Sequence, residues 1–319
     1  FYGGYATMAV PAAIFVRRFN YKKGIILGLA LYSLGALLFY PAAKFEAFGY
    51  FLISLYILTF GLAFLETTAS PYIMSMGEDN TATRRLNLAQ AFNPFGSLLG
   101  MFVASNFILS KLKSDQRDIS GELLFNSLGD AEKAIIRTHD LSIISMPYII
   151  LGFFVAGMLI LITITKMPNK ISESHLSNEF EAFKRLFRNA NYREGVIAQM
   201  FYVGAQIMCW TFIIQYADKL GIPKAQAQNY NILAMSIFLT SRFLCTYLMK
   251  FISSKKLLTL FAVGGIISIF GVIFIHDIRG LYFLIATSAF MSLMFPTIYG
   301  LALHGLQSDT SLGAAGLVM

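Results

Sequence analysis

The chain has 319 residues, of which 56% are hydrophobic and only 13% are charged, and it carries a formal net charge of +8. Soluble globular domains carry roughly 25% charged residues, so this composition excludes an ordinary soluble protein. Apolar runs of about 20 residues recur along the sequence, which is the pattern of α-helices that cross a bilayer. We therefore expect an all-α polytopic membrane protein.

The apolar runs define ten expected membrane segments, of which the last is too short to cross a bilayer. In chain order they occupy residues 1–16, 24–43, 48–76, 86–110, 143–165, 195–217, 226–249, 257–275, 280–303 and 311–319. The sequence starts without Met in what reads as the interior of a helix, and it stops within the short final run. We therefore expect a fragment of a longer protein.

Lysine and arginine are distributed unequally among the connections between these runs. The connections that follow the odd-numbered runs hold 15 of them, and the remaining connections hold 9. Because Lys and Arg accumulate in cytoplasmic loops, we expect the first set to be cytoplasmic. The same distribution explains the net charge without nucleic-acid binding, which we do not expect.

The central cytoplasmic connection, residues 166–193, is the expected domain boundary. It separates an N-terminal bundle, 1–165, from a C-terminal bundle, 194–319. Within this linker, apolar residues recur at helical spacing among Glu and Lys, which predicts an amphipathic helix lying on the membrane surface. These residues are Phe180, Phe183, Leu186 and Phe187.

One carboxylate lies inside an expected span. Glu66 falls within 48–76, whereas the other 16 of the 17 Asp and Glu residues lie in loops or at span ends. A charged side chain at the bilayer centre costs about 2.5–3.5 kcal/mol on insertion scales, so such a residue usually has a function. Burial disfavours the charged form of a carboxyl group, which suits a proton carrier. We interpret Glu66 as a proton-coupling residue, with a structural hydrogen bond between helices as the alternative.

The next span carries a line of carboxamides. Asn87, Gln90 and Asn93 are followed by Ser97 at helical spacing, so they share one face. Uncharged amides donate and accept hydrogen bonds, and they can bind sugar hydroxyls without burying a charge. The alternative is that these amides hold neighbouring helices together.

A second polar face is expected in the C-terminal half. Gln199, Tyr202, Gln206 and Trp210 follow helical spacing in the run 195–217, and Trp210 is the single tryptophan of the sequence. An aromatic ring beside amides can pack against the C–H face of a sugar. Core packing of the aromatic side chains is an equally good interpretation. Asn231, in the following span, is either a cavity residue or a helix cap.

The remaining candidate is an arginine. Arg242 lies eight residues before Lys250, within reach of the cytoplasmic interface by snorkelling. We interpret it as a structural gate rather than a substrate contact. Cys209 and Cys245 lie in apolar runs without metal-binding or redox spacing, which indicates small core residues. No phosphate loop, zinc motif or nucleophile motif is visible, so we expect no enzyme, metal site or cofactor.

Several of these stretches resemble those of a known family. They are Leu65–Pro71, Arg85–Asn93, Gln199–Gln206 and Ser288–Ser292, together with Phe295–Ile298. They are similar to the L-fucose permeases of the major facilitator superfamily, whose members include fucose, galactose and glucose:proton symporters.

The resemblance implies twelve helices in two pseudo-symmetric bundles of six, of which about ten are present here. Residues 1–165 would then hold helices 2 to 6, and 194–319 would hold helix 7 to the start of helix 11. It also implies proton coupling at Glu66 and sugar contacts at Gln90 and Asn93. The second coupling carboxylate of the family belongs to the missing first helix.

The expected function is L-fucose:proton symport by alternating access, driven by the proton gradient across a bacterial inner membrane. The partners are a sugar, a proton and the lipid bilayer, and we expect a monomer. Phe295 stands where the fucose permeases have a tyrosine before the proline of the tenth helix, so glucose/galactose:proton symport stays open. More distant alternatives are a drug or metabolite antiporter on the same fold and a sugar sensor that does not transport.

Overall fold

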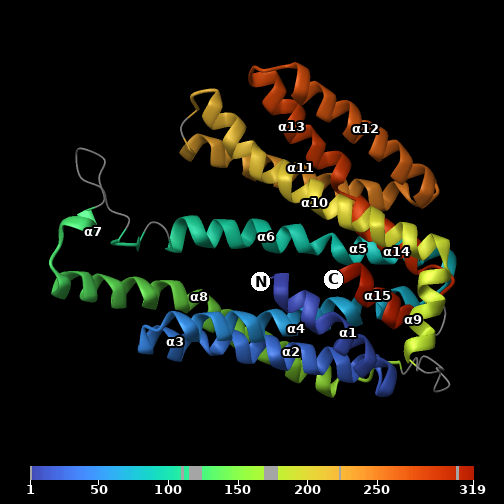
Figure 1. Cartoon of the computed structure of the whole chain (residues 1–319), viewed down its shortest axis with the longest axis horizontal. Coiled ribbons are helices and arrows are strands. Elements are labelled where there is room, and N and C mark those ends of the chain that lie inside the picture. Colours follow the sequence, from blue (N-terminus) through green and yellow to red (C-terminus); the bar gives the residue numbers. More distant parts are fainter. Residues whose placement is uncertain (1, 109–110, 115–123, 169–178, 223, 307–308) are drawn as a thin grey trace. The chain divides into compact units, whose positions relative to one another are not determined.

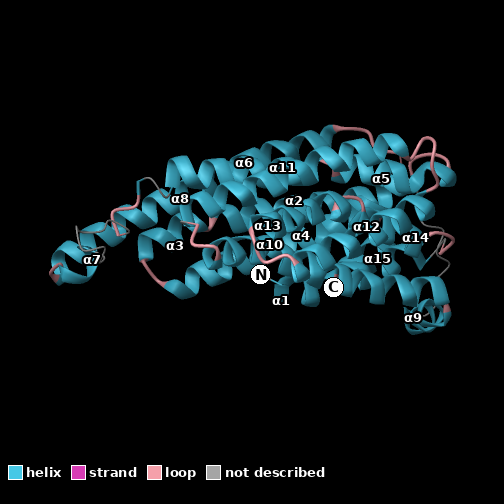
Figure 2. Cartoon of the chain, turned by 90° about the horizontal axis from the view of Figure 1, so that it is seen from above, coloured by secondary structure: helices cyan, strands magenta, loops and turns pink. Residues whose placement is uncertain are grey.

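The computed structural model describes residues 2–108, 111–114, 124–168, 179–222, 224–306 and 309–319. Within these ranges every regular element is helical (Figure 1, Figure 2). In chain order the elements are α1 (Tyr2–Arg18), α2 (Tyr21–Leu37), α3 (Phe39–Phe45), α4 (Phe48–Ser75), the 3₁₀ helix η1 (Asp79–Thr81), α5 (Ala82–Gln90), α6 (Phe92–Val103), the π-helix η2 (Ala104–Ile108), α7 (Leu124–Ser127), α8 (Asp130–Ile164), α9 (Glu179–Arg188), α10 (Ala190–Lys219), α11 (Lys224–Leu248), α12 (Ser254–Phe274), α13 (Ile278–Met291), α14 (Met294–Leu303) and α15 (Thr310–Val318).

Eight segments of the described chain are long and apolar enough to cross a membrane. They hold 21 to 35 residues each, and a helix of about 20 residues already matches the hydrocarbon core of a bilayer. The segments are Tyr21–Phe45, Phe48–Ser75, Asp79–Ile108, Asp130–Ile164, Ala190–Lys219, Gln226–Leu248, Ser254–Phe274 and Ile278–Leu303. The expected runs 1–16 and 311–319 correspond to α1 and α15, which have 17 and 9 residues. The all-α expectation is confirmed.

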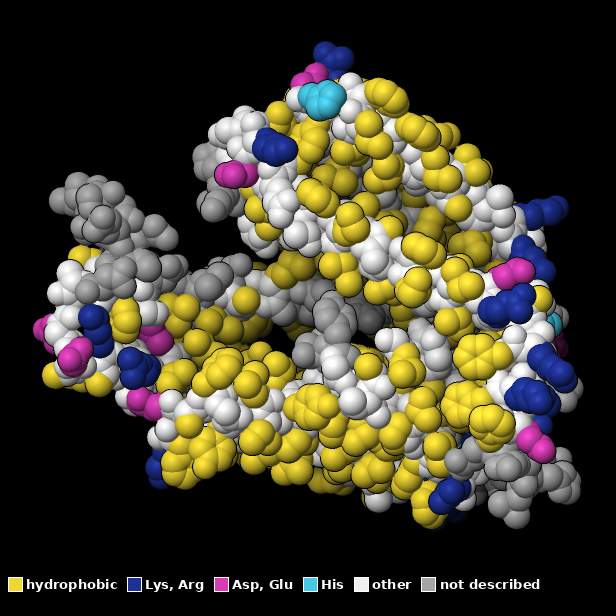
Figure 3. All heavy atoms as spheres, viewed as in Figure 1, with side chains coloured by type: hydrophobic (Ala, Val, Ile, Leu, Met, Phe, Trp, Pro, Cys, Tyr) yellow, Lys and Arg dark blue, Asp and Glu magenta, His cyan; other side chains and the backbone are white. Residues whose placement is uncertain are grey.

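Large apolar side chains face outward on many of these helices. Phe153 and Phe154 of α8 are exposed, as are Leu260 and Ile267 of α12. Figure 3 shows hydrophobic side chains over much of the visible surface, with Lys and Arg gathered mainly near helix ends. Apolar patches of this extent are costly in water and match contact with lipid.

The chain divides into two compact units. Unit 1 comprises Phe1–Ala69, Gly100–Ser174 and Val318–Met319, and unit 2 comprises Ser70–Leu99 and His175–Leu317.

In unit 1, helix α2 packs along α8 (Figure 1). The rings of Phe39 and Tyr148 stack with centroids 3.9 Å apart, and the Ser33 hydroxyl donates to the Gly152 carbonyl at 2.9 Å. This bond satisfies the serine hydroxyl, which would otherwise be a buried polar group without a partner between two apolar helices. These contacts join α2 and α3 to α8.

In unit 2, one apolar core joins α10, α11 and α13. Ile213 of α10, Phe238 of α11 and Leu281 of α13 are buried in it. Helix α12 packs on α13, and helix α14 packs on both α10 and α5. Of the candidate residues on α10, Tyr202 belongs to this core and Trp210 packs against it.

Two apolar runs that we expected to be continuous are interrupted. Helix α5 gives way to α6, and α13 gives way to α14, each after one or two residues outside a helix. Pro94 is the third residue of α6 and Pro296 is the third residue of α14. Proline lacks the N–H that would bond the carbonyl four residues earlier, but it is tolerated in the first turn of a helix. A new helix therefore begins just before each proline.

Helix α9 occupies part of the expected linker, while residues 169–178 of that linker lie outside the described residues. Phe180 and Phe187 are 77% and 66% exposed, whereas Leu186 is buried. Leu186 packs inward together with the buried Ala182, and the position of this helix on the membrane surface stays a prediction.

An ion pair ties α9 to the start of α15. The Arg185 guanidinium donates to both carboxylate oxygens of Asp309, from Nε at 2.8 Å and from Nη2 at 2.9 Å. This hydrogen bonding to Asp309 raises the pKa of Arg185 above its ordinary value. The bidentate geometry fixes the orientation of α9 within unit 2.

Close packing of α2 on α4 predicts a strict size limit at Gly61. A Cβ at Gly61 would lie 2.6 Å from the Gly28 carbonyl oxygen and closer still to the Tyr32 backbone nitrogen. We expect Gly61→Ala to lower the melting temperature of the purified protein, with an overpacking cost of about 1–3 kcal/mol. The control is Gly157→Ala in α8, because a Cβ there meets no atom within 4 Å. Equal melting temperatures for the two variants would contradict close packing at Gly61.

Candidate functional site

Glu66 belongs to unit 1 and lies on α4 at the margin of its buried side. The carboxylate residue is half-buried, whereas the neighbouring Thr67 and Thr68 are fully buried. Thr68 packs against Gly24 of α2, where a Cβ would come within 2.9 Å of the threonine methyl group. The tight contact with α2 fixes this turn of α4 and therefore fixes the position of Glu66.

The other candidate residues belong to unit 2, where the line of amides divides into a buried part and an exposed part. Asn87 is 0% exposed. Its Nδ2 donates to the Thr83 carbonyl at 2.9 Å and to the Thr297 hydroxyl at 3.2 Å. Asn87 thus joins α5 to α14, and this geometry favours the helix-packing alternative for this residue.

Gln90 and Asn93 lie on either side of the break between α5 and α6. Gln90 is half-buried, and its Nε2 lies 3.4 Å from the Ser70 hydroxyl, at the long limit of a hydrogen bond. Asn93 is exposed. Ala91 between them keeps helical dihedral angles, with φ −65° and ψ −21°, so the two amides retain the predicted spacing. Their side chains are the accessible part of the amide face.

The predicted face on α10 also divides. Gln199 and Tyr202 are buried, and the Tyr202 hydroxyl donates to the Met291 carbonyl at 2.8 Å. Both amide atoms of Gln199 lack a hydrogen-bond partner in the described part of the chain. Gln206 and Trp210 are half-buried. Tyr202 therefore supports the end of α13, and the accessible part of this face begins at Gln206.

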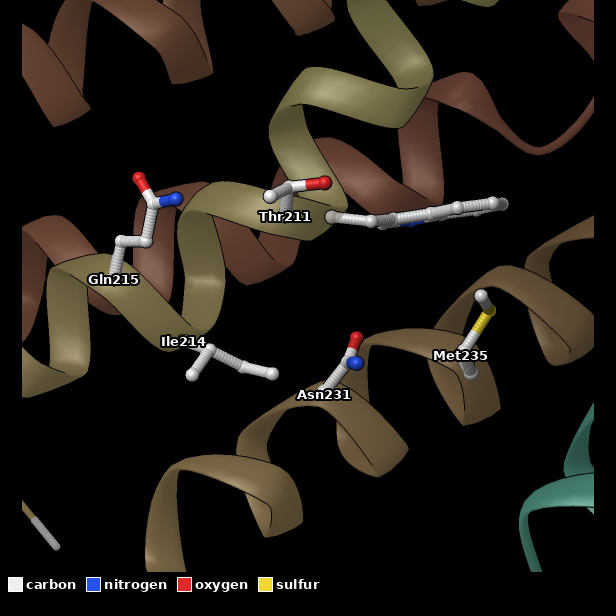
Figure 4. A pocket seen from close by; sticks show the side chains of 6 residues that line it. Thr211, Ile214, Gln215, Asn231 and Met235 are labelled. Carbon is white, nitrogen blue, oxygen red and sulfur yellow. The ribbon is translucent and has the colours of Figure 1, made fainter. Parts of the chain in front are cut away.

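Trp210 lines an open pocket of about 400 Å³ between α10 and α11 (Figure 4). The other lining residues are Thr211, Ile214, Gln215, Asn231 and Met235. In Figure 4 the Asn231 amide points from α11 toward α10, and the Gln215 amide on α10 points away from α11. Pockets for small ligands span roughly 300–1,000 Å³, so this one has room for a monosaccharide.

The chemistry of this pocket is neutral and amphipathic. Its lining includes the Thr211 hydroxyl and the amides of Gln215 and Asn231 beside the apolar Ile214 and Met235. The Trp210 indole N–H and the Asn231 Oδ1 are buried and lack a hydrogen-bond partner in the described part of the chain. Trp210 is braced by Phe238, with ring centroids 5.1 Å apart in an edge-to-face arrangement. Thr211 and Gln215 were missed in the sequence because both side chains are exposed, and only the packing of α11 against α10 reveals that they border a pocket.

Phe295 and Arg242 complete the candidate residues. Phe295, the second residue of α14, packs against the unit 2 core and stacks on Tyr299 with ring centroids 6.3 Å apart. Arg242 is only 4% exposed, so it does not extend to the interface as its position in the sequence predicted. Backbone carbonyls of Gln90 and Ser292 accept its hydrogen bonds, and these hold the side chain inside unit 2.

Within the described ranges, no group of three or more His, Cys, Asp or Glu residues is placed to hold a metal ion. Cys209 of α10 and Cys245 of α11 are free and buried.

A family model described as Major Facilitator Superfamily matches residues 1–319. The chain belongs to this superfamily. The L-fucose-proton symporter of Haemophilus influenzae is 62% identical over 320 residues, which cover 100% of this chain and 75% of that protein. A glucose/galactose transporter of Brucella abortus is 29% identical over 323 residues, which cover 100% of this chain and 73% of that protein.

A solved structure agrees with these matches. The crystal structure of the Escherichia coli fucose:proton symporter matches with a TM-score of 0.92 and 33% identity, over 100% of this chain and 78% of that one. The resemblance to the L-fucose permeases is thereby confirmed, and so is the major facilitator fold. Together with the eight candidate spans, family membership indicates a multi-pass membrane protein.

The buried hydroxyl of Tyr202 leads to a stability prediction. We expect Tyr202→Phe to lower the melting temperature, because the Met291 carbonyl loses a donor inside an apolar core, at a cost of about 0.5–1.5 kcal/mol. The matched control is Tyr282→Phe, since Tyr282 on α13 is exposed. A melting temperature unchanged in both variants would show that the Tyr202 hydroxyl does not contribute to stability.

Proposed function

We propose that this protein is an L-fucose:proton symporter that works by alternating access. The observation that carries the proposal is the 62% identity, over the whole chain, to a protein named L-fucose-proton symporter. The glucose/galactose alternative has weaker support, because the relative with that name is 29% identical over a similar length. The accessible amides of Gln90 and Asn93 speak against a transporter of purely apolar compounds.

In this proposal Glu66 takes up and releases the coupled proton. A carboxyl group is neutral when protonated and carries a full negative charge when ionised, so its protonation state sets the energetic cost of holding it in an apolar span. Gln90 and Asn93 bind sugar hydroxyls through their accessible amides. Trp210 and the pocket around it receive the sugar on the side of the α10–α11 connection, which the charge distribution places outside the cell.

The proposed symporter consists of two helical bundles and a linker. We infer that residues 1–165 and 194–319 form two helical bundles joined by 166–193, and that Arg242 acts as a structural gate. The protein works in the bacterial inner membrane, as a monomer and without a cofactor, because the proton gradient supplies the free energy. A competition panel of L-fucose, galactose and glucose against labelled L-fucose uptake in proteoliposomes tests the choice of sugar.

The proton role of Glu66 predicts a split phenotype. Glu66→Gln keeps the shape of the side chain but cannot release a proton, so we expect it to abolish accumulation of labelled L-fucose driven by a pH gradient. Exchange of labelled for unlabelled sugar across the membrane should persist, because it requires no net proton movement. The control is Glu78→Gln, on an exposed loop residue. Normal gradient-driven accumulation by Glu66→Gln would refute the assignment.

The two classes of amide predict opposite effects. We expect Asn93→Ala to raise the Kd for L-fucose about three- to tenfold, the loss of about one hydrogen bond, without lowering the melting temperature. Asn87→Ala should instead lower the melting temperature, because the Thr297 hydroxyl loses its donor. Equilibrium dialysis and thermal unfolding of the same preparations measure both effects. An unchanged Kd in Asn93→Ala would remove this residue from the sugar site.

A further inference from the structure

The two helix breaks of unit 2 leave two particular carbonyl groups without their usual partners. In a continuous helix the N–H of each residue bonds the carbonyl four residues earlier. Pro94 and Pro296 have no N–H, so the carbonyls of Gln90 and Ser292 lose this bond. In a span that offers no water, a backbone carbonyl left unsatisfied costs several kcal/mol.

One side chain serves both of these carbonyls. Arg242 of α11 donates from Nη1 to the Gln90 carbonyl at 2.9 Å and from Nε to the Ser292 carbonyl at 2.5 Å. The planar guanidinium group presents its donors in a fixed fork, which allows two acceptors to be bound at once. Gln90 is the last residue of α5, and Ser292 is the C-cap of α13. The positive charge therefore also lies at the negative ends of two helix dipoles.

The guanidinium group is held in place by its own helix. Its Cζ lies over the Phe238 ring, 4.6 Å from the centroid, and the Phe238 ring packs against Trp210. The Ser241 hydroxyl donates to the Ala289 carbonyl at 2.9 Å, which joins α11 to the end of α13 beside the break. Because Arg242 is almost fully buried, water does not compete for these bonds.

We propose that Arg242 is a positioning residue that replaces the two backbone hydrogen bonds removed by Pro94 and Pro296. It binds both interrupted helices through their carbonyls and so fixes the residues at the breaks. Gln90 and Asn93 flank the first break, and Phe295 follows the second. Arg242 acts on the sugar site through the backbone and makes no contact with the sugar. The proposal uses sugar binding as one readout, and in that respect it rests on the proposed function.

A mutant cycle tests the replacement directly. Arg242→Gln should raise the Kd for L-fucose at least about tenfold and lower the melting temperature. Arg242→Lys should give a Kd and a melting temperature between those of Arg242→Gln and wild type, because an ammonium group is a compact donor that lacks the paired N–H groups of the guanidinium. In a Pro94→Ala/Pro296→Ala background the alanine N–H groups can bond the two carbonyls. Arg242→Gln should there change the Kd by less than about twofold and should lower the melting temperature less.

Arg85 provides the matched control, because it also bonds backbone carbonyls. It donates to the Met74 carbonyl at 2.6 Å and to the Glu78 carbonyl at 2.9 Å, and no proline removed the partners of these two groups. The double-proline background should therefore give no rescue of Arg85→Gln. The proposal is overturned if Arg242→Gln changes the Kd and the melting temperature equally in both backgrounds, or changes them in neither.

A second measurement covers the case in which the double-proline variant does not fold. Deoxy analogues of L-fucose, each lacking one hydroxyl, are titrated against wild type and Arg242→Gln. The same titration is run on Gln90→Ala and Asn93→Ala, and a positioning residue predicts that a hydroxyl whose loss costs less in Arg242→Gln also costs less in one of these two variants. If the loss of a hydroxyl costs affinity in wild type, Gln90→Ala and Asn93→Ala but not in Arg242→Gln, Arg242 contacts that hydroxyl and the proposal fails.

If wild type binds galactose or glucose instead of L-fucose, the same cycle is run with the sugar that binds. If it binds none of the three, the coupling between Arg242→Gln and the proline replacements is measured in the melting temperature. Rescue there supports the positioning role, and equal loss in both backgrounds overturns it.

Discussion

Backbone hydrogen bonding in an apolar setting is the constraint on which unit 2 depends. A continuous helix satisfies its own carbonyls, but each break exposes groups that lipid cannot bind. In unit 2 the breaks are stabilised by a buried arginine and by hydroxyl groups such as that of Tyr202, which bonds the last residue of α13. Polar side chains inside this unit therefore maintain the irregular backbone as well as offering groups to a ligand.

This requirement separates the polar residues into two populations. Asn87 and Tyr202 are buried and hold α14 and α13 in place, whereas Asn93 is exposed and Trp210 borders an open pocket. The first population gives a rigid frame, and the second gives accessible donors and acceptors attached to that frame. A binding site whose side chains stand on such fixed elements loses little conformational freedom when a ligand arrives.

The sequence predicted the spans well because hydropathy measures the transfer of side chains, and that term dominates in a membrane segment. It did not predict the breaks, since both runs stay apolar across Pro94 and Pro296. Helical spacing placed Asn87 and Asn93 on one face, but only the packing of α14 shows that Asn87 is covered. The burial of Arg242 was missed for a similar reason: its partners are backbone carbonyls, which every residue has. The roles of Glu66 and of the two bundles stay predictions.

Cys209 and Cys245 are buried in α10 and α11, so neither thiol is presented to a water-soluble maleimide in this conformation. A cysteine introduced at the exposed Thr211 or Gln215 would react with such a maleimide without competition from the two native thiols. Its labelling rate would follow the opening and closing of the neighbouring pocket, without prior removal of the native thiols.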